Sequence, residues 1–306
     1  MQQPVQRLFQ NFEPLTPDPS PARGEGSFET ASQPKDGQRH QLLRYFAQRV
    51  RWCRRTMLDL LLPPCCVNCQ KEILSSGGDL LFCEACRKLL GPPAWPHCSH
   101  CGGSLPQACL TASDCHWCRR HPLRFDTVVP LGIYDGELRR VVLRMKRSSG
   151  ETLAVNMGRL LGQCRAEEIA AIHADIVVPI PMFWTRKLKH GINSAELLAE
   201  LLAQTVGLPY RRRVLARKRN TVRQMELTPP ARFQNLRNAF RLRAGYDLRD
   251  SRVLLVDDVL TTGATCSAAA ETLKRAGARS VAVAVLARAE GHLQRQQTGP
   301  ASNRVE

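Results

Sequence analysis

The sequence lacks the features that define several large classes of protein. No apolar run approaches the roughly 18 residues that suggest a membrane-spanning helix, and the N-terminus has no basic start followed by an apolar stretch. These two absences predict a cytoplasmic protein with no transmembrane segment. The chain also has no GxxxxGK followed by Ser or Thr, and not even a Gly-Lys dipeptide, which excludes a P-loop nucleotide hydrolase.

Acidic and aromatic residues are scarce. The chain of 306 residues has 44 Lys and Arg but only 27 Asp and Glu, which gives a formal net charge of +17. This excess of positive charge attracts phosphate groups, so polyanions are the expected kind of partner, although net charge names no particular one. Aromatic side chains make up 6% of the chain, which gives little support to a platform on which nucleic-acid bases stack.

Changes of composition divide the chain into five segments. Residues 1–40 are rich in Pro, Ser, Gly and charge and are expected to form a disordered tail, with a second tail at 291–306. Residues 41–63 carry apolar side chains at helical spacing opposite basic ones, which predicts a lead-in helix or a basic amphipathic surface. Residues 64–122 are rich in Cys, Gly and Pro, whereas residues 123–290 alternate apolar strands with helical patterns.

The segment 123–290 predicts an α/β fold. Strands are expected at 125–134, 174–181, 252–258 and 280–288, and helices at 137–146, 153–171, 193–207 and 264–277. Asn193 is the expected N-cap of the third helix, and Gly277 closes the fourth. Continuous runs of Val, Ile and Leu in strands that alternate with helices are typical of a parallel sheet covered on both faces.

Eight of the 13 cysteines form four Cys-x-x-Cys pairs in a duplicated register. The pairs are Cys66/Cys69, Cys83/Cys86, Cys98/Cys101 and Cys115/Cys118, and shifting the first two by 32 positions reproduces the last two. Cytosolic thiols stay reduced, so metal ligation is favoured over disulfides. A redox pair or an iron–sulfur cluster would suit one isolated pair, but the duplication predicts a double zinc ribbon with two structural Zn2+ ions. Two arrangements fit this spacing: either consecutive pairs share a metal ion, or the first pair shares one with the third in a cross-braced arrangement.

The stretch VLLVDDVLTTGAT, at 253–265, combines two carboxylates with a turn that suits an anion. The turn at 261–265 precedes a helix, so backbone N–H groups, hydroxyls and the helix dipole converge on one phosphate. Asp257 and Asp258 lie beside that turn, where they can accept hydrogen bonds from sugar hydroxyls. A response-regulator acidic pocket would lie near the start of a domain and would not continue into Thr-Thr-Gly. The pattern therefore predicts a site for a sugar phosphate.

The same stretch resembles the signature of the type I phosphoribosyltransferases, in which an apolar strand leads into two acidic residues and a Thr-Thr-Gly turn. The resemblance implies that Asp257 and Asp258 are the catalytic acidic pair that holds the ribose hydroxyls of phosphoribosyl pyrophosphate. It also implies that Mg2+ bridges ribose and pyrophosphate oxygens. The loop that the resemblance assigns to the 5-phosphate consists of Thr261, Thr262, Gly263, Ala264 and Thr265.

Three further stretches, together with the cysteine repeat, resemble the ComF family of competence-associated proteins, which join a double zinc ribbon to a type I phosphoribosyltransferase fold. They are VVPIPM at 177–182, HGINSAELLA at 190–199 and RQMELTPPARFQNLRNAF at 223–240. The residues assigned by this resemblance are a pyrophosphate loop of Pro179, Ile180 and Pro181, and a basic loop with Arg219, Arg223, Gln224, Arg232 and Asn235. One departure is that His-Gly-Ile-Asn-Ser stands at 190–194, where the family usually has Arg-Gly-Phe-Asn-Gln.

The basic segment between Arg211 and Arg243 contains eleven Lys and Arg residues and one acid, Glu226. In a phosphoribosyltransferase it would form the mobile loop over the pyrophosphate, where positive charge stabilises the leaving group. It would also suit the backbone of single-stranded DNA, bound without regard to sequence. A third interpretation is a solvated basic face.

Two classes of function follow from the resemblance. The first is a ComF-type protein that binds phosphoribosyl pyrophosphate and Mg2+ and acts in DNA uptake or in the use of external DNA, beside a helicase-like competence protein. The alternatives are an active salvage phosphoribosyltransferase for purines or pyrimidines, and a non-catalytic ligand sensor or nucleic-acid-binding adaptor. A shared fold does not establish turnover, because activity belongs to the site.

Metal analysis of the purified chain tests the cysteine repeat directly. We expect about two zinc ions per chain, because each half of the repeat supplies four thiolates, the ligand number of a closed tetrahedral site. Elemental analysis by mass spectrometry measures both the metal and its amount. One ion per chain, or iron in place of zinc, would overturn the double zinc ribbon.

Overall fold

The computed structural model describes residues 63–73, 80–93, 95–105, 115–120, 123–147, 149–183, 193–218 and 229–290 of the chain. Both predicted tails, and all of the predicted lead-in helix except its last residue, lie outside these ranges. The chain divides into two units, Met1–Leu58 and Asp59–Glu306, and the description below concerns the second. Within the described ranges, no helix is both long enough and apolar enough to cross a membrane.

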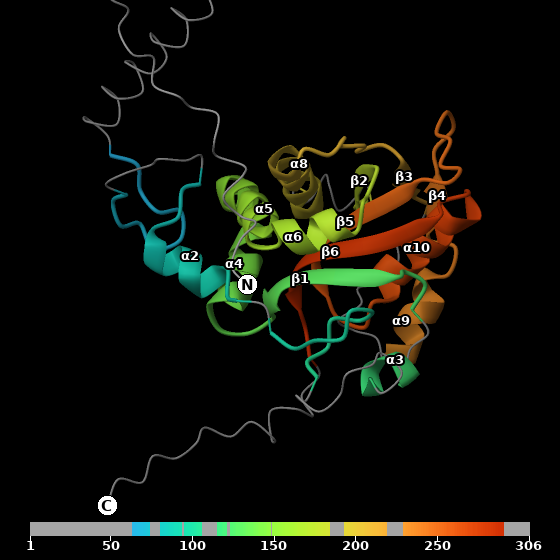
Figure 1. The fold of residues 1–306 in the computed structure, drawn as a ribbon, viewed down its shortest axis with the longest axis horizontal. Helices are drawn as coiled ribbons and strands as arrows, with labels where there is room; N and C mark the ends of the chain where they lie inside the picture. The colour runs from blue at the N-terminus through green and yellow to red at the C-terminus, as the bar shows by residue number, and fades with distance from the viewer. Residues whose placement is uncertain are drawn as a thin grey trace, which may run out of the picture. The chain divides into compact units, whose positions relative to one another are not determined.

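The core of the second unit is a four-stranded parallel sheet with the strand order β1-β6-β5-β2 (Figure 1). The strands are β1 (Thr127–Ile133), β2 (Ile176–Pro179), β5 (Arg252–Leu260) and β6 (Ser280–Arg288). All four were predicted from their apolar runs, and the parallel pairing confirms the predicted α/β class. Every residue of β6 after Ser280 is buried, as expected for a central strand with helices on both faces.

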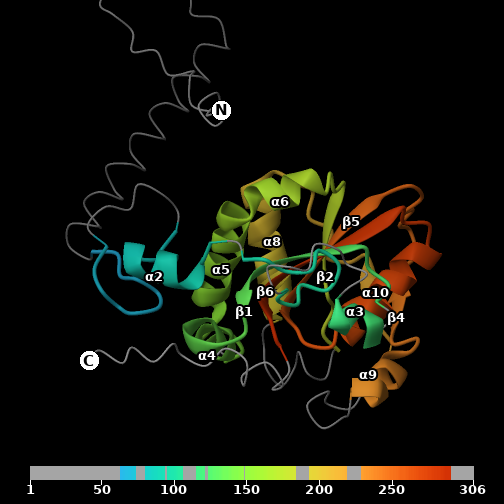
Figure 2. The same ribbon diagram turned by 60° about the horizontal axis from the view of Figure 1, so that its bottom comes forward.

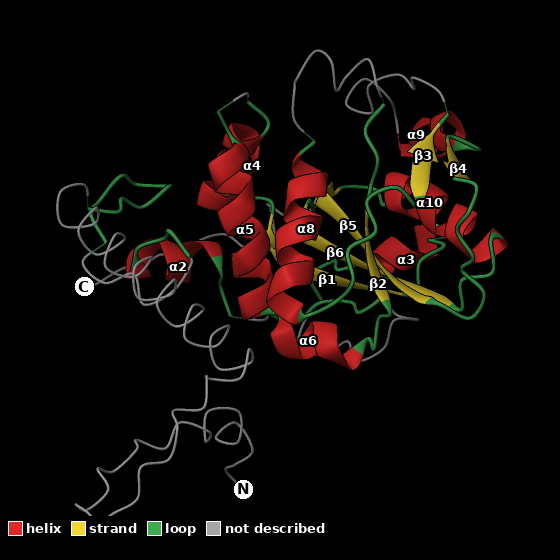
Figure 3. Cartoon of the chain, turned by 90° about the horizontal axis from the view of Figure 1, so that it is seen from above, coloured by secondary structure: helices red, strands yellow, loops and turns green. Residues whose placement is uncertain are grey.

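Helices cover both faces of this sheet. On one face α4 (Gly136–Met145), α5 (Glu151–Cys164) and α8 (Ser194–Val206) lie next to one another (Figure 3). On the other face α10 (Ala264–Arg275) packs beside α9 (Pro229–Leu236) (Figure 2). Alternate residues of β5 therefore enter two separate hydrophobic clusters, Leu254 and Val256 on the first face and Leu255 on the second.

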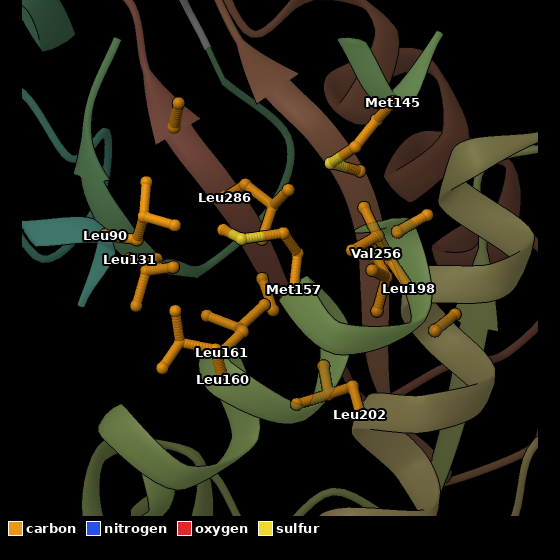
Figure 4. Packing of buried hydrophobic residues seen from close by; sticks show 14 of the residues in the cluster. Leu90, Leu131, Met145, Met157, Leu160, Leu161, Leu198, Leu202, Val256 and Leu286 are labelled. Atoms are coloured by element: carbon orange, nitrogen blue, oxygen red, sulfur yellow. The ribbon is translucent and has the colours of Figure 1, made fainter. Parts of the chain in front are cut away.

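The cluster under α5 and α8 contains most of the large apolar side chains. Met157 and Leu161 of α5 meet Leu198 and Leu202 of α8 over Val256 of the sheet (Figure 4). The two helices approach closely at Gly158, where an added Cβ would lie 2.8 Å from the Leu198 carbonyl oxygen. This contact fixes α8, whose first residue reaches the candidate site described below.

The single helix predicted at 153–171 is wrong, because the structure breaks it into α5 and α6 (Ala166–Ala171). The break lies at Arg165, which is 4% exposed and has φ −121° and ψ 23°. Its guanidinium donates hydrogen bonds to the carbonyl oxygens of Pro92, Pro130 and Leu131 at 3.0, 3.1 and 2.7 Å. A buried cation needs such partners, and they lie in other parts of the chain, so the helical pattern could not reveal the break.

Two further differences concern α8 and the basic segment. Asn193 precedes α8 as predicted, but its side chain does not cap the helix; it donates instead to the carbonyl oxygen of Ile180 at 3.2 Å. The described parts of the basic segment form α9 and a two-stranded antiparallel sheet of β3 (Leu215–Arg217) and β4 (Phe240–Leu242), which the sequence did not predict. Residues 219–228 lie outside the described ranges.

Candidate functional site

The two aspartates of the predicted site lie near the carboxyl end of β5. Residues 253–256 of the strand are fully buried, whereas Asp257 and Asp258 are half-buried. The Asp258 carboxylate oxygen Oδ2 lies 3.1 Å from Lys146 Nζ and accepts a hydrogen bond from Ser194 Oγ at 3.3 Å. Lys146 is the C-cap of α4, and Ser194 begins α8. Three elements that are distant in sequence therefore meet at one carboxylate.

Asp257 is held by its neighbours in the chain. Its Oδ1 accepts a hydrogen bond from the Asp258 N–H at 2.9 Å, and its Oδ2 lies 3.8 Å from Cys266 Sγ of α10. Burial, followed by repulsion from Asp258, raises the pKa of Asp257 to about 7. At Lys146 burial alone would lower the pKa, but attraction to Asp258 and Asp257 raises it. The site therefore sets a lysine cation against an acidic pair that does not readily carry two charges.

The predicted phosphate loop follows directly after β5. Gly263 has φ +79°, a conformation that favours glycine, and an added Cβ there would lie 2.7 Å from Leu123 Cδ2. Helix α10 begins at Ala264, so its first backbone N–H groups have no partner within the helix and point toward the loop. Loop residues 261–265 therefore lie between the acidic pair and the start of α10, and the start of a helix is a place that suits an anion.

The pyrophosphate loop predicted at 179–181 lies at the same edge of the sheet. Pro179 ends β2 opposite Val256, and the Ile180 N–H donates to the Val256 carbonyl oxygen at 2.9 Å. The Ile180 side chain is buried in the core, so its contribution to a ligand site would come from the backbone. Of the predicted basic loop, Arg232 and Asn235 lie on α9, while Arg219, Arg223 and Gln224 lie outside the described ranges.

Two residues of this site were not identified from the sequence. Lys146 follows directly after a helix whose sequence pattern showed only an amphipathic face, and nothing near it in the sequence links it to β5. Ser194 lies in the stretch that departs from the family pattern, and its hydroxyl contact with Asp258 gives that position a partner. Both belong to loops or helix ends at the carboxyl edge of a parallel sheet, where binding sites of α/β folds form.

The eight paired cysteines form two groups of four. The groups are Cys66, Cys69, Cys83 and Cys86, and Cys98, Cys101, Cys115 and Cys118; within each group the sulfur atoms lie within 4.8 Å of one another. Consecutive pairs therefore combine, and the cross-braced alternative does not occur. We call these groups the first and second cysteine clusters.

The sulfur positions fit a tetrahedral metal. Neighbouring sulfurs are 3.6 Å apart between Cys69 and Cys83, and 3.4 Å apart between Cys101 and Cys115. Zinc–sulfur bonds of about 2.3 Å in a tetrahedron require sulfurs about 3.8 Å apart, so a small relaxation would accommodate the ion. His100 Nδ1 lies 3.5 Å from Cys118 Sγ, but four sulfurs already complete the second cluster.

Both clusters are attached to the sheet domain by hydrogen bonds. Beside the first, Asn68 donates to Glu137 Oε1 at 3.1 Å, and Arg144 Nη1 donates to Asn68 Oδ1 at 2.8 Å, so this cluster holds α4. Beside the second, the Val128 N–H of β1 donates to the Ser99 carbonyl oxygen at 2.8 Å. The two clusters therefore support different elements around the candidate site.

Comparison with known proteins agrees with this architecture. A family model described as the phosphoribosyl transferase domain matches residues 148–302. Competence protein F of Haemophilus influenzae is 29% identical over 229 residues, which are 73% of this chain and 96% of that protein. DNA utilization protein YhgH of Salmonella typhimurium is 30% identical over 221 residues, which are 68% of this chain and 96% of that protein.

Solved structures similar to this chain include the glutamine phosphoribosylpyrophosphate amidotransferase of B. subtilis. It is 24% identical, with a TM-score of 0.33, and the match covers 47% of this chain and 30% of that one. The parallel sheet, the loop after β5 and the matched family model define a type I phosphoribosyltransferase-like protein with two four-cysteine clusters before its sheet domain. The chain belongs to the ComF family of phosphoribosyltransferase-domain proteins, with Competence protein F and YhgH as relatives.

The raised pKa of Asp257 predicts a stability that falls as the pH rises. Between the ordinary pKa of 3.8 and the folded-state value of about 7, the folded protein keeps a proton that the unfolded chain has lost. Raising the pH through this window therefore lowers the free energy of unfolding. Asp257→Asn removes this titration and still accepts the Asp258 N–H, so we expect it to raise stability at about pH 8 by roughly 2–4 kcal/mol.

Urea unfolding of the wild type and Asp257→Asn at about pH 5 and about pH 8 measures this effect. Asp247→Asn is the matched control, because Asp247 is an exposed aspartate whose partner is Arg249. Its pKa is lowered to about 2 by hydrogen bonds from Arg249, so it does not titrate in this range. A stability difference between wild type and Asp257→Asn that is equal at both pH values would contradict a raised pKa.

Proposed function

We propose that this chain binds phosphoribosyl pyrophosphate together with Mg2+ at the carboxyl end of β5. The observation that carries the proposal is the position of Asp257 and Asp258 directly before a loop that leads, through the left-handed Gly263, into the start of α10. Loop residues 261–265 would hold the 5-phosphate, and the two carboxylates would accept hydrogen bonds from the ribose hydroxyls. The backbone at 179–181 would face the pyrophosphate.

The acidic pair also suits a hard cation. Mg2+ prefers oxygen ligands and is usually held by one or two carboxylates together with substrate phosphates, which Asp257 and Asp258 could provide with this ligand. A bound Mg2+ would neutralise part of the negative charge on pyrophosphate. Lys146 adds a fixed positive charge 3.1 Å from Asp258 Oδ2, so the chain itself contributes to the balance of charge.

The proposed site also supports a transfer reaction. A nucleophile would attack the anomeric carbon of the ribose, and the bond from that carbon to pyrophosphate would break, with pyrophosphate as the leaving group. Positive charge that develops on the ribose would be stabilised by the carboxylates of Asp257 and Asp258. No covalent intermediate on the protein is needed. The chemistry does not specify the acceptor, which would be a purine or a pyrimidine in a salvage enzyme.

Calorimetric titration with phosphoribosyl pyrophosphate and Mg2+ tests the proposal. We expect the wild type to bind, Asp258→Asn to lower the affinity by about tenfold or more, and Asp247→Asn to bind as the wild type does. The conservative change removes a charge and keeps the shape. Absence of binding by the wild type would contradict the proposed site.

The same samples separate turnover from recognition. Incubation with a panel of purines and pyrimidines, followed by measurement of released pyrophosphate, identifies a transferase if one base releases it. Binding without release from any base would favour a ligand sensor or an adaptor in DNA handling.

We also propose a role in DNA uptake or utilisation, for which the names of the relatives provide support. A second observation favours single-stranded DNA as a partner. Arg241 and Arg243 are exposed on and just after β4, while the residues next to them, Phe240 and Leu242, turn toward the core. Alternation along the strand therefore places both guanidinium groups on one face, where they can follow a phosphate backbone.

The DNA partner predicts a salt-dependent affinity. Replacing Arg241 and Arg243 by Gln should weaken binding to an oligothymidine several-fold and reduce the slope of log affinity against log salt by about 1.4, since two phosphate contacts are lost. Fluorescence anisotropy at several salt concentrations measures both quantities. The control is Arg275→Gln/Arg279→Gln, which removes the same charge from exposed arginines elsewhere. Equal losses in the two double variants would indicate a general effect of net charge and contradict a defined DNA path.

A further inference from the structure

Arg288 is a buried arginine that the proposed chemistry does not use. It is the last residue of β6, and it is 3% exposed. Its Nη1 donates hydrogen bonds to the carbonyl oxygens of Leu260 at 3.0 Å and Ala289 at 2.8 Å, and also to that of Thr261. Leu260 ends β5, and Thr261 begins the phosphate loop. The guanidinium therefore holds the backbone at the point where the strand becomes the loop.

The same guanidinium contacts the second cysteine cluster. Its carbon lies 5.3 Å from the centre of the Trp117 ring, and Trp117 stands between Cys115 and Cys118 in the sequence. An added Cβ on Gly102, the residue after Cys101, would lie 3.5 Å from Arg288 Cδ, so the arginine stem also packs against this turn. Arg288 Nε is buried and has no hydrogen-bond partner among the described residues. One side chain therefore joins the metal-binding turns to the start of the phosphate loop.

Leu123 provides a second contact between the cluster and the loop. It packs against Cys98, Cys101 and Cys115 of the second cluster. Its Cδ2 also lies 2.7 Å from the position that a Cβ on Gly263 would occupy. The left-handed turn of the loop is therefore packed against a side chain whose position depends on the cluster.

Charge explains how the state of the second cysteine cluster would affect Arg288. A buried guanidinium is costly unless opposite charge or hydrogen-bond acceptors surround it. The acceptors described above are backbone carbonyl oxygens, which carry only partial charge. A metal-loaded four-thiolate cluster carries net negative charge, because four thiolates outweigh one divalent ion. The loaded second cluster would therefore stabilise Arg288 in the position from which it holds the loop.

We propose that Arg288 is a positioning residue through which metal occupancy of the second cysteine cluster sets the geometry of the phosphate loop. Combined with the proposed function, on which this step rests, the coupling makes affinity for phosphoribosyl pyrophosphate depend on the metal. Coupling between two binding sites is reciprocal, so the bound ligand also raises the affinity of the second cluster for its metal. The first cluster contacts α4 and lacks this route through Arg288.

Hydrogen exchange in the full-length, metal-loaded protein tests the coupling without the ligand. Arg288→Lys keeps the charge but cannot reach three carbonyl oxygens at once. We expect amide exchange at residues 261–265 to rise by about tenfold or more. Arg165→Lys is the matched control, since Arg165 is 4% exposed and also donates to backbone carbonyl oxygens, four of them. Arg165→Lys should lower the global stability of the protein. Amide exchange at residues 261–265 should then rise no more than exchange in the rest of the protein does.

The metal itself is tested by paired cysteine variants. Cys118→Ser and Cys69→Ser each disable one cluster, and we expect only Cys118→Ser to raise exchange in the loop. In the wild type, phosphoribosyl pyrophosphate with Mg2+ should raise the affinity of one of the two zinc sites by about threefold or more, measured at equilibrium by competition with a chelating dye. In Arg288→Lys it should not. If Arg288 had only a structural role, the ligand would have the same effect on zinc in the wild type and in Arg288→Lys.

The outcomes separate this inference from the proposed function. Unchanged loop exchange in Arg288→Lys overturns the inference, whether or not the protein binds phosphoribosyl pyrophosphate. Equal loosening of the loop by both cysteine variants also overturns it, because the effect would then be general. Loop exchange that rises in Arg288→Lys and in Cys118→Ser, in a wild type that does not bind phosphoribosyl pyrophosphate, supports the positioning role and contradicts the proposed ligand.

Discussion

The arrangement of this protein depends on two adjacent carboxylates at the end of a buried strand. Burial makes their charged forms unfavourable, mutual repulsion adds to that cost, and the raised pKa of Asp257 reflects both. The surrounding elements each compensate for it in part. Lys146, at the end of α4, brings a positive charge, and Ser194, at the start of α8, brings a hydroxyl group. The N-terminus of α10, which is the positive end of its helix dipole, follows the acidic pair in the chain. In the proposed function, the ribose diol would donate hydrogen bonds to this pair, and Mg2+ would offset its negative charge.

Much of the fold could be predicted because its signals are local. The strand β5, the turn after it and α10 follow one another in a single stretch, so spacing and residue type were sufficient. Lys146 and Ser194 could not be identified in that way, since each meets Asp258 only after parallel strands have brought distant loops to one edge of the sheet. The helix break at Arg165 escaped prediction for the same reason, because its carbonyl partners come from elsewhere in the chain.

The cysteine repeat shows the same division between pattern and contact. The duplicated register identified the eight cysteines, whereas the combination of consecutive pairs required coordinates. Neither the register nor the spacing indicated what the clusters support. The first holds α4 through Asn68, and the C-cap of α4 is Lys146 of the candidate site. The second lies against β1 and, through Arg288, against the loop after β5.

The cysteine-rich segment also contributes apolar residues to the main core. Phe82 and Leu90 belong to the same hydrophobic cluster as Met157 and Leu286 of the sheet domain. Each part therefore covers apolar surface that the other would expose to water if it stood alone. The boundary expected near residue 122 separates two sequence patterns that share one core. An evolutionary exchange of either part between proteins would have to carry the matching surface with it, which favours inheritance of the pair as one piece.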